Sequence, residues 1–407
     1  MGKNFYHLWF SQILSQVTVN MMNFLLLARL FHVTGSAIAT SLLWVAYALP
    51  AIFFGPIGAG LADFVSRRKT LLITNLLQSL AVLLYILSYN YSIFSTFVVV
   101  IIYSLLNQFY VPAESASLPS AVSKNKLPKA NSMFFITQQI ALIVGFGFAG
   151  IIEKFIGFEG ALIICAVNLF LAFISVSFLP NFAPRKIIPE DREEIMKAFF
   201  NHIIEGYLFI KNRKTIIYSL GLLFLIQVGL AMIFVNLPVI ALEILKVATS
   251  YVGVLVVVPA GIGATIGSIY INKLIKKGWR KKKIINMGLI ALGVGVFAIA
   301  WAIPFIPAPL RFISGPILIV LIGFGFIAVN IPTLTFLQEI VPVWLRGRVF
   351  GNLYFLITIT TIFPIIFSGI ISEFFGVKTL LTMLSIGVIL VLSYSVRSGQ
   401  RLIDENF

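Results

Sequence analysis

The chain has 407 residues, of which 59% are hydrophobic and only 11% are charged, and it carries a net charge of +16. Soluble domains contain about a quarter charged residues, so this composition excludes an ordinary soluble domain and indicates a membrane protein that crosses the bilayer many times. Most basic residues lie in the segments between apolar runs, which argues against nucleic-acid binding as their purpose.

Long apolar runs recur along the whole chain. A helix of about 20 apolar residues crosses a bilayer, and the ten-residue alternating segments typical of a membrane β-barrel are absent from the sequence. The sequence therefore predicts an all-α membrane protein of about 12 transmembrane helices. The expected spans are 5–31, 37–62, 70–89, 95–113, 131–152, 160–179, 215–240, 250–272, 284–303, 311–335, 350–372 and 379–396.

The basic residues are distributed unequally between the two faces that these spans define. One face collects 25 of the 30 Lys and Arg residues, and the other holds Arg29, Lys154, Lys246, Arg311 and Lys378. Positively charged loops stay in the cytosol. We therefore expect a multi-pass protein of the cell (inner, cytoplasmic) membrane with both termini in the cytoplasm.

One polar segment divides the spans into six plus six. Residues 180–214 are rich in charge and proline, and after Pro189 apolar residues recur at helical spacing, which predicts an amphipathic helix on the inner membrane surface. We expect a six-helix bundle at 1–179, a cytoplasmic linker at 180–214 and a second six-helix bundle at 215–407. Similar proline-rich and basic segments follow the fourth and tenth spans, so the bundles are expected to be pseudo-symmetric, with a site between the halves.

Four fragments in order resemble the major facilitator superfamily, in particular its drug-exporter branch with macrolide efflux pumps and siderophore exporters. The second fragment matches the family's loop signature at Asp63, Arg67 and Arg68, while Phe64 and Ser66 depart from it. The fragments are "TGSAIA" at 34–39, "GLADFVSRRK" at 60–69, "VPAESASLPSAV" at 111–122 and "LRGRVFG" at 345–351. The resemblance implies the major facilitator fold, alternating access and proton coupling.

Four amide side chains form a polar stripe on the first span. Gln12, Gln16, Asn20 and Asn23 fall at roughly 0°, 40°, 80° and 20° on a helix that turns about 100° per residue. An amide in a membrane helix either bonds a neighbouring helix or lines a cavity. Because the resemblance implies that spans one, four, seven and ten line the cavity, the cavity-lining interpretation is favoured.

The fourth span has a second polar face. Tyr103, Asn107, Tyr110 and Glu114 fall within about 60° of one another. Three roles remain open for the acid: an ion pair with Arg67 or Arg68 in a gate, a proton carrier, or a solvated loop residue. The resemblance adds further residues to the expected cavity on spans seven and ten, and these are Gln227, Asn236 and Asn330.

A gate on the cytosolic side is the second expected site. Asp63 ends the second span, and a carboxylate there can face the positive N-terminal end of another helix. The resemblance implies that this helix is span eleven, with Arg346 and Arg348 close by. The alternative is a solvated turn acid that only assists topology.

The remaining signals are the glycines of two spans and the small number of possible metal ligands. Glycines at 145, 147 and 150, and at 261, 263 and 267, are expected to allow close helix contact. With a single cysteine, Cys165, and three scattered histidines, no metal site or cofactor is expected. The expected partners are a small amphipathic substrate, protons and membrane lipids, without nucleic acid, and the chain is expected to act as a monomer.

The sequence favours a transporter that exports bulky amphipathic or hydrophobic molecules, because a strongly charged substrate would require Arg or Lys in the cavity. A lysophospholipid or lipid flippase requires the same kind of cavity and is the nearest alternative. A lipid-linked transferase would require clustered Asp, His or Arg, which the scattered acids do not provide, so we expect no enzyme. A receptor that retains the fold without transport stays open.

Overall fold

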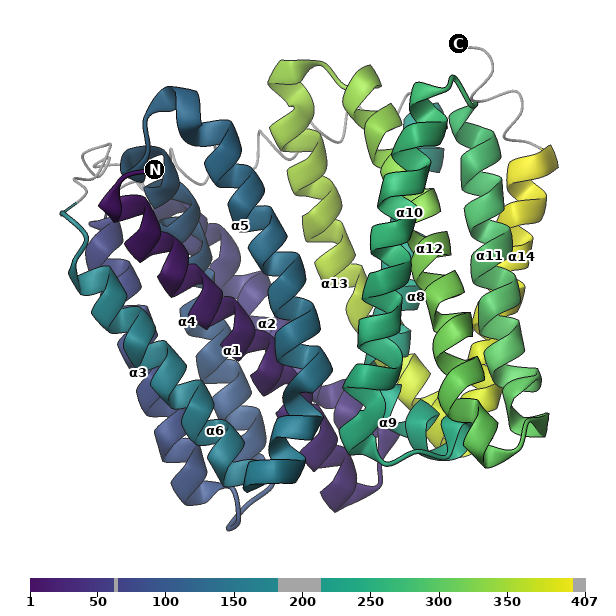
Figure 1. Cartoon of the computed structure of the whole chain (residues 1–407), viewed down its shortest axis with the longest axis horizontal. Coiled ribbons are helices and arrows are strands. Elements are labelled where there is room, and N and C mark those ends of the chain that lie inside the picture. The colour runs from purple at the N-terminus through teal and green to yellow at the C-terminus, as the bar shows by residue number, and fades with distance from the viewer. Residues whose placement is uncertain (62–64, 182–213, 398–407) are drawn as a thin grey trace. The chain divides into compact units, whose positions relative to one another are not determined.

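The structure is a computed structural model that describes residues 1–61, 65–181 and 214–397 (Figure 1). Within these ranges all regular elements are helical. They form two compact units: unit 1 contains α1 to α6 with the segment Thr249–Gly253, and unit 2 contains the remaining helices from α8 to α14. The predicted linker helix after Pro189 lies outside the described residues, and the predicted domain boundaries stay predictions.

The first half of the chain forms six long helices and two short helical turns, one before α5 and one between α5 and α6. Its elements are α1 (Lys3–Thr34), α2 (Ala37–Leu61), α3 (Arg67–Ser88), α4 (Phe94–Ala121), the 3₁₀ turn η1 (Lys124–Lys126), α5 (Leu127–Ala141), the π-helical turn η2 (Leu142–Phe146) and α6 (Gly147–Ser177).

The second half of the chain repeats this pattern with more short turns. Its elements are α8 (Lys214–Val235), α9 (Leu237–Val239), η3 (Ile240–Leu245), η4 (Thr249–Tyr251), η5 (Gly253–Val257), α10 (Val258–Lys276), α11 (Lys281–Trp301), η6 (Ile303–Phe305), α12 (Ala308–Ile340), α13 (Val343–Phe375) and α14 (Val377–Arg397).

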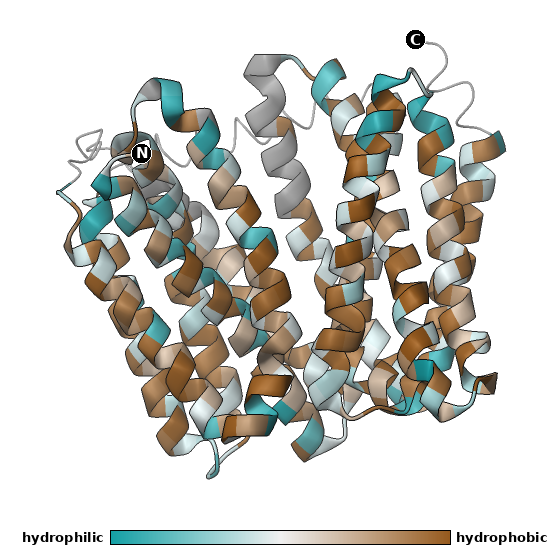
Figure 2. Cartoon of the chain, in the orientation of Figure 1, coloured by the Kyte–Doolittle hydropathy of each residue, from teal (hydrophilic) through white to brown (hydrophobic). Residues whose placement is uncertain are grey.

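Eleven helical segments of the described chain are long and apolar enough to cross a membrane. One of them, Lys129–Ser177, has 49 residues, roughly twice the length that one crossing needs. Inside it Gly157 has φ 78° and ψ 167°, a conformation that glycine adopts readily, so the chain reverses there. Counting this segment twice gives 12 crossings, which confirms the predicted all-α membrane fold. Figure 2 shows hydrophobic residues along the helices and hydrophilic residues gathered near their ends.

The fourth span is longer than the sequence predicts. We expected a loop after residue 113, but α4 continues through Pro112 and Pro119 to Ala121. Proline removes one helical hydrogen bond, which membrane helices tolerate when neighbouring groups contact the freed carbonyl. Pro112 frees the carbonyl of Gln108, and α2 approaches that oxygen at Gly58, where an added Cβ would lie 2.1 Å from it. The correction places Glu114 inside a helix rather than in a loop.

A central helix organises each unit. In unit 1, α1 packs against α2, α4, α5, α6 and η2. Its first turns lie in an apolar cluster, where Phe5 and Leu8 meet Leu71 of α3 and Val176 of α6. In unit 2, α12 packs extensively against both α10 and α11. The buried polar residues of α1, which are Ser11, Gln12, Ser15 and Thr18, therefore lie among other helices of the same unit.

Candidate functional site

The four amides of α1 lie in different surroundings. Gln12 is fully buried, and its side-chain nitrogen donates to the carbonyl of Phe134 on α5 at 3.1 Å. Asn20 is half-buried and donates to the carbonyl of Gln16, one turn earlier, at 2.7 Å. Gln16 and Asn23 are also half-buried. Gln12 therefore joins two helices, whereas the other three amides keep part of their surface accessible.

A buried polar cluster around one acid lies between α1, α3 and α4 in unit 1. Glu114 is only 3% exposed, and the hydroxyl of Tyr110 donates to its Oε1 at 2.7 Å. The Tyr110 hydroxyl also lies near the hydroxyls of Ser11 and Ser15. Asn75 of α3 completes the group, since it accepts a hydrogen bond from Ser15 at 3.1 Å. We call these five residues the Glu114 cluster.

The sequence analysis identified only two members of this cluster, Glu114 and Tyr110. Ser11 and Ser15 were missed because small hydroxyl residues are common in membrane helices and carry no positional signal, and Asn75 was not considered. The signal available was on the third span, where Asn75 and Gln78 interrupt an otherwise apolar run. The Gln78 amide donates to the carbonyl of Tyr103 at 3.4 Å, which ties α3 to α4.

The basic residues at the start of α3 bind backbone carbonyls. Arg67 is 2% exposed and donates to the carbonyl of Ala116 at 2.9 Å and to the Ser120 hydroxyl at 3.2 Å. Arg68 donates to the carbonyl of Ser177 at 2.5 Å. Within the described residues, these contacts join α3 to α4 and α6, and the Glu114 carboxylate is held by Tyr110 instead.

The expected gate lies largely beyond what the structure describes. Asp63 is outside the described residues. Arg346 and Arg348 lie on the first turns of α13, and their side chains are also outside the description. The gate therefore stays a prediction.

The polar face of α4 meets α2 as well as α3. Tyr103 is buried, and the half-buried Asn107 lies within reach of the Tyr47 hydroxyl of α2. Ser104 donates to the carbonyl of Tyr47 at 2.6 Å. A narrow gap near this contact brings together residues of α1, α2 and α4, and it is lined by Asn23, Leu26, Leu43, Trp44, Tyr47 and Val100. Asn23 and Asn107 thus lie in one polar and aromatic neighbourhood.

The predicted residues of unit 2 do not converge in the same way. Asn236 is fully buried and donates to the carbonyl of Met232 at 2.8 Å and to the Ser368 hydroxyl of α13 at 3.0 Å. Gln227 on α8 and Asn330 on α12 are half-buried. Asn236 therefore connects two helices, while Gln227 and Asn330 keep accessible surface.

A separate cluster lies at the other end of unit 1. The Tyr89 hydroxyl donates to Glu159 at 2.7 Å, and the Arg29 guanidinium carbon lies 4.1 Å from the centre of the Tyr89 ring. Arg29 also lies over Phe158, at 4.7 Å. The hydrogen bond to Glu159 raises the pKa of Tyr89 above its ordinary value. This cluster ties the ends of α1 and α3 to α6.

Within the described chain, no group of three or more His, Cys, Asp or Glu side chains is arranged to hold a metal ion. The Glu114 cluster can bind or release a proton or attract a cation, and the half-buried amides can donate and accept hydrogen bonds. These side chains therefore have the chemistry that hydrogen-bond recognition and proton exchange require.

The sequence profile of the Major Facilitator Superfamily matches residues 8–363. The chain belongs to this superfamily of membrane transporters. It is 25% identical to the MFS-type transporter YfmI of Bacillus subtilis, over 97% of this chain and 95% of that protein. It is 26% identical to macrolide efflux protein A of Streptococcus pyogenes, over 58% of this chain and 57% of that protein.

Solved structures agree with the family assignment. The structure of the nucleoside transporter NupG superposes with a TM-score of 0.71 at 15% identity, covering 97% of this chain and 98% of that chain. A POT family transporter in complex with a peptide conjugate superposes with a TM-score of 0.72 at 12% identity, covering 98% of this chain and 96% of that chain. These similarities show the major facilitator fold.

Proposed function

We propose that this transporter exports bulky amphipathic or hydrophobic small molecules by alternating access, and that proton entry drives the export. It would act in the cytoplasmic membrane with both termini inside. The observation that carries the proposal is the Glu114 cluster: one buried carboxylate among hydroxyls and an amide. The similarity to a macrolide efflux protein supports the same class of substrate.

The balance of charge in unit 1 favours a neutral or cationic substrate over an anionic one. The buried cation Arg67 is already hydrogen-bonded to α4 at the end of the helices. Arg29, near the other end of α1, lies over the rings of Tyr89 and Phe158. The polar groups that α1 and α4 bring together between these two cations are amides, hydroxyls and the Glu114 carboxylate. An anionic substrate would need a cation to compensate the loss of hydration of its charge.

Glu114 is the residue to which we assign the coupling proton. A carboxylate inside a membrane helix is costly, so such a residue usually serves a function, and proton relays are a common one. Tyr110 donates to the carboxylate, and the Ser15–Asn75 hydrogen bond lies beside Tyr110 in the same cluster. Glu114→Gln is therefore expected to separate substrate movement from proton movement.

Transport assays in proteoliposomes test both parts of the proposal. The wild-type protein is expected to accumulate a macrolide or an amphipathic dye against its gradient when a pH gradient is applied. Glu114→Gln is expected to keep exchange of labelled for unlabelled substrate but to lose accumulation driven by the pH gradient. Glu243→Gln, which changes an exposed acid of η3, is the control and should behave as wild type.

The same vesicles distinguish the alternatives. Movement of a fluorescent lysophospholipid without movement of macrolide or dye would replace export with lipid flipping. Specific binding without movement of any of these compounds would identify a receptor. Proton-driven accumulation by Glu114→Gln at the wild-type rate would remove Glu114 from the coupling mechanism.

A further inference from the structure

The exposed side of α5 has two sectors of different chemistry. On a helix that turns about 100° per residue, the buried side chains of α5 fall within about 60° of one another, and these are Ala130, Phe134, Thr137 and Ala141. On the exposed side, what we call the polar sector consists of Asn131, Phe135, Gln138 and Gln139. The apolar sector beside it consists of Ile136 and Ile140. The outer surface of α5 is therefore rich in amides on one side and aliphatic on the other.

The two glutamines of the polar sector lie inside the membrane-spanning part of α5. The span predicted from hydrophobicity begins at residue 131, so at about 1.5 Å per residue Gln138 lies about 10 Å beyond its start. Among the described residues, neither the Gln138 nor the Gln139 side chain has a hydrogen-bond partner. An amide without a partner is costly in hydrocarbon, and polar residues at this depth usually face a water-filled cavity. The polar sector therefore suits contact with water rather than with acyl chains.

The helices α1 and α5 lie side by side and run in the same direction (Figure 1). At one level, the Gln12 side chain of α1 donates to the carbonyl of Phe134 on α5 at 3.1 Å. Further along, just after α5 ends, a Cβ added at Gly145 would lie 2.8 Å from the Cβ of Asn20. These two contacts determine which residues of the two helices lie at the same depth.

Between these two contacts both helices carry amides. Gln16 lies one turn beyond Gln12 on α1 and is half-buried. Gln138 lies one turn beyond Phe134 on α5 and is exposed, as is Gln139. An uncharged amide can both donate and accept hydrogen bonds. The amides of α1 and α5 therefore form one hydrogen-bonding surface at a similar depth.

We propose that Gln138 and Gln139 determine substrate specificity by extending the hydrogen-bonding surface of α1 across α5. Their amides bind carbonyl, ether or hydroxyl oxygens of an amphipathic substrate, and Phe135 contacts its apolar part. A substrate that lacks such oxygens leaves the amides unpaired when it displaces water, so it binds more weakly. These roles rest on the proposed export function, and they add the fifth span to the spans expected to line the cavity.

Cysteine labelling tests whether the polar sector is in contact with water, and it needs no transported compound. A thiol in water ionises more readily than one among apolar groups, and the thiolate is the reactive form. In full-length protein in lipid nanodiscs, we expect a charged thiol reagent to label Gln139→Cys several-fold faster than Ile140→Cys. Ile140 is the matched control because it is 54% exposed and lies in the apolar sector of the same helix. Labelling of Gln139→Cys no faster than that of Ile140→Cys would overturn the proposal.

Substrate selectivity tests the recognition itself. Transport of erythromycin, which is rich in hydroxyl, ether and carbonyl oxygens, is compared with transport of tetraphenylphosphonium, which has no hydrogen-bonding group. Both rates are measured in proteoliposomes at low concentration, where they depend on affinity. Gln138→Leu and Gln139→Leu are each expected to lower the rate for erythromycin relative to tetraphenylphosphonium about two- to tenfold, the effect of one lost hydrogen bond to a neutral partner. Ile140→Leu, in the apolar sector, should leave this ratio unchanged.

The possible outcomes distinguish the role of the two glutamines from the export function. An unchanged ratio in both glutamine variants, with transport by the wild type, would overturn the specificity role and leave the export function standing. A wild type that moves neither compound would contradict the export function. The labelling rates would then decide by themselves whether the polar sector is in contact with water.

Discussion

At the scale of single residues, Gln12 and Gln16 are one turn apart on α1 yet have different surroundings. Gln12 is fully buried and bonded to α5, whereas Gln16 is half-buried. Gln12→Leu should therefore lower the free energy of unfolding by about 1 kcal/mol, the value of one hydrogen bond. Gln16→Leu should leave stability unchanged and lower substrate affinity. Thermal unfolding and ligand binding of the two variants, measured in one detergent, check both expectations. Equal destabilisation by the two variants would show that Gln16 also acts in packing.

The buried Thr18 tests the energetic cost of an unsatisfied hydroxyl. Thr18 is fully buried, and its Oγ1 has no hydrogen-bond partner among the described residues. Thr18→Val keeps the shape and removes the hydroxyl, so we expect the free energy of unfolding to stay constant or rise by about 1 kcal/mol. The comparison is Ser15, whose hydroxyl donates to Asn75: Ser15→Ala should lower the free energy of unfolding. A lower melting temperature for Thr18→Val than for Ser15→Ala would contradict this account.

At the scale of helices, α10 and α12 approach closely through a reciprocal pair of glycines. A Cβ added at Gly263 would lie 2.0 Å from the carbonyl oxygen of Val320, and one at Gly323 would lie 2.2 Å from that of Ala260. Gly263→Ala must separate the helices, and overpacking of this kind costs about 1–3 kcal/mol. Gly387→Ala on α14 meets nothing within 4 Å and should be neutral or stabilising by up to about 1 kcal/mol. Thermal unfolding compares the Gly263→Ala and Gly387→Ala variants. Equal melting temperatures would show that α10 and α12 can move apart without loss of stability.

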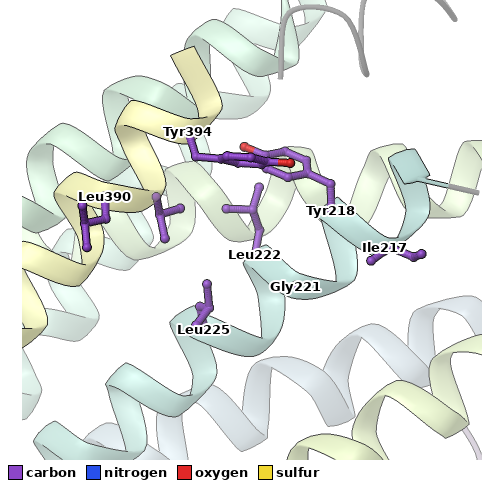
Figure 3. Close-up of a pocket in the computed structure, with 8 residues that line it drawn as sticks. Ile217, Tyr218, Gly221, Leu222, Leu225, Leu390 and Tyr394 are labelled. Carbon is purple, nitrogen blue, oxygen red and sulfur yellow. The ribbon is translucent and has the colours of Figure 1, made fainter. Parts of the chain in front are cut away.

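The hydrophobic runs made the helices predictable, but the distances between neighbouring helices could not be predicted from the sequence. The apolar runs predicted the 12 crossings because a helix in lipid satisfies its own backbone hydrogen bonds. The predicted end of the fourth span was wrong because a proline such as Pro112 usually indicates a helix end. In the structure the helix continues, and the freed carbonyl of Gln108 lies close to α2 at Gly58. The stripe on α1 was predicted as a periodicity, but only packing determines that Gln12 bonds Phe134. A pocket of about 500 Å³ between α8 and α14 (Figure 3) has no sequence signal, since it depends on the distance between two helices.

At the scale of the whole molecule, the unequal distribution of basic residues predicts orientation in the membrane. Positive loops stay inside, so residues near the basic clusters should face the cytosol. We predict that cysteines introduced at Ser123 and Lys283, both exposed, react in intact cells only with reagents that cross the membrane. A cysteine at Tyr91, whose side chain is 88% exposed, should react with an impermeant reagent from outside. The native Cys165 is fully buried, so its background labelling should be low. Labelling of the Lys283 cysteine by an impermeant reagent in intact cells would contradict the assigned orientation. So would a Tyr91 cysteine that the impermeant reagent labels in permeabilised cells but not in intact ones.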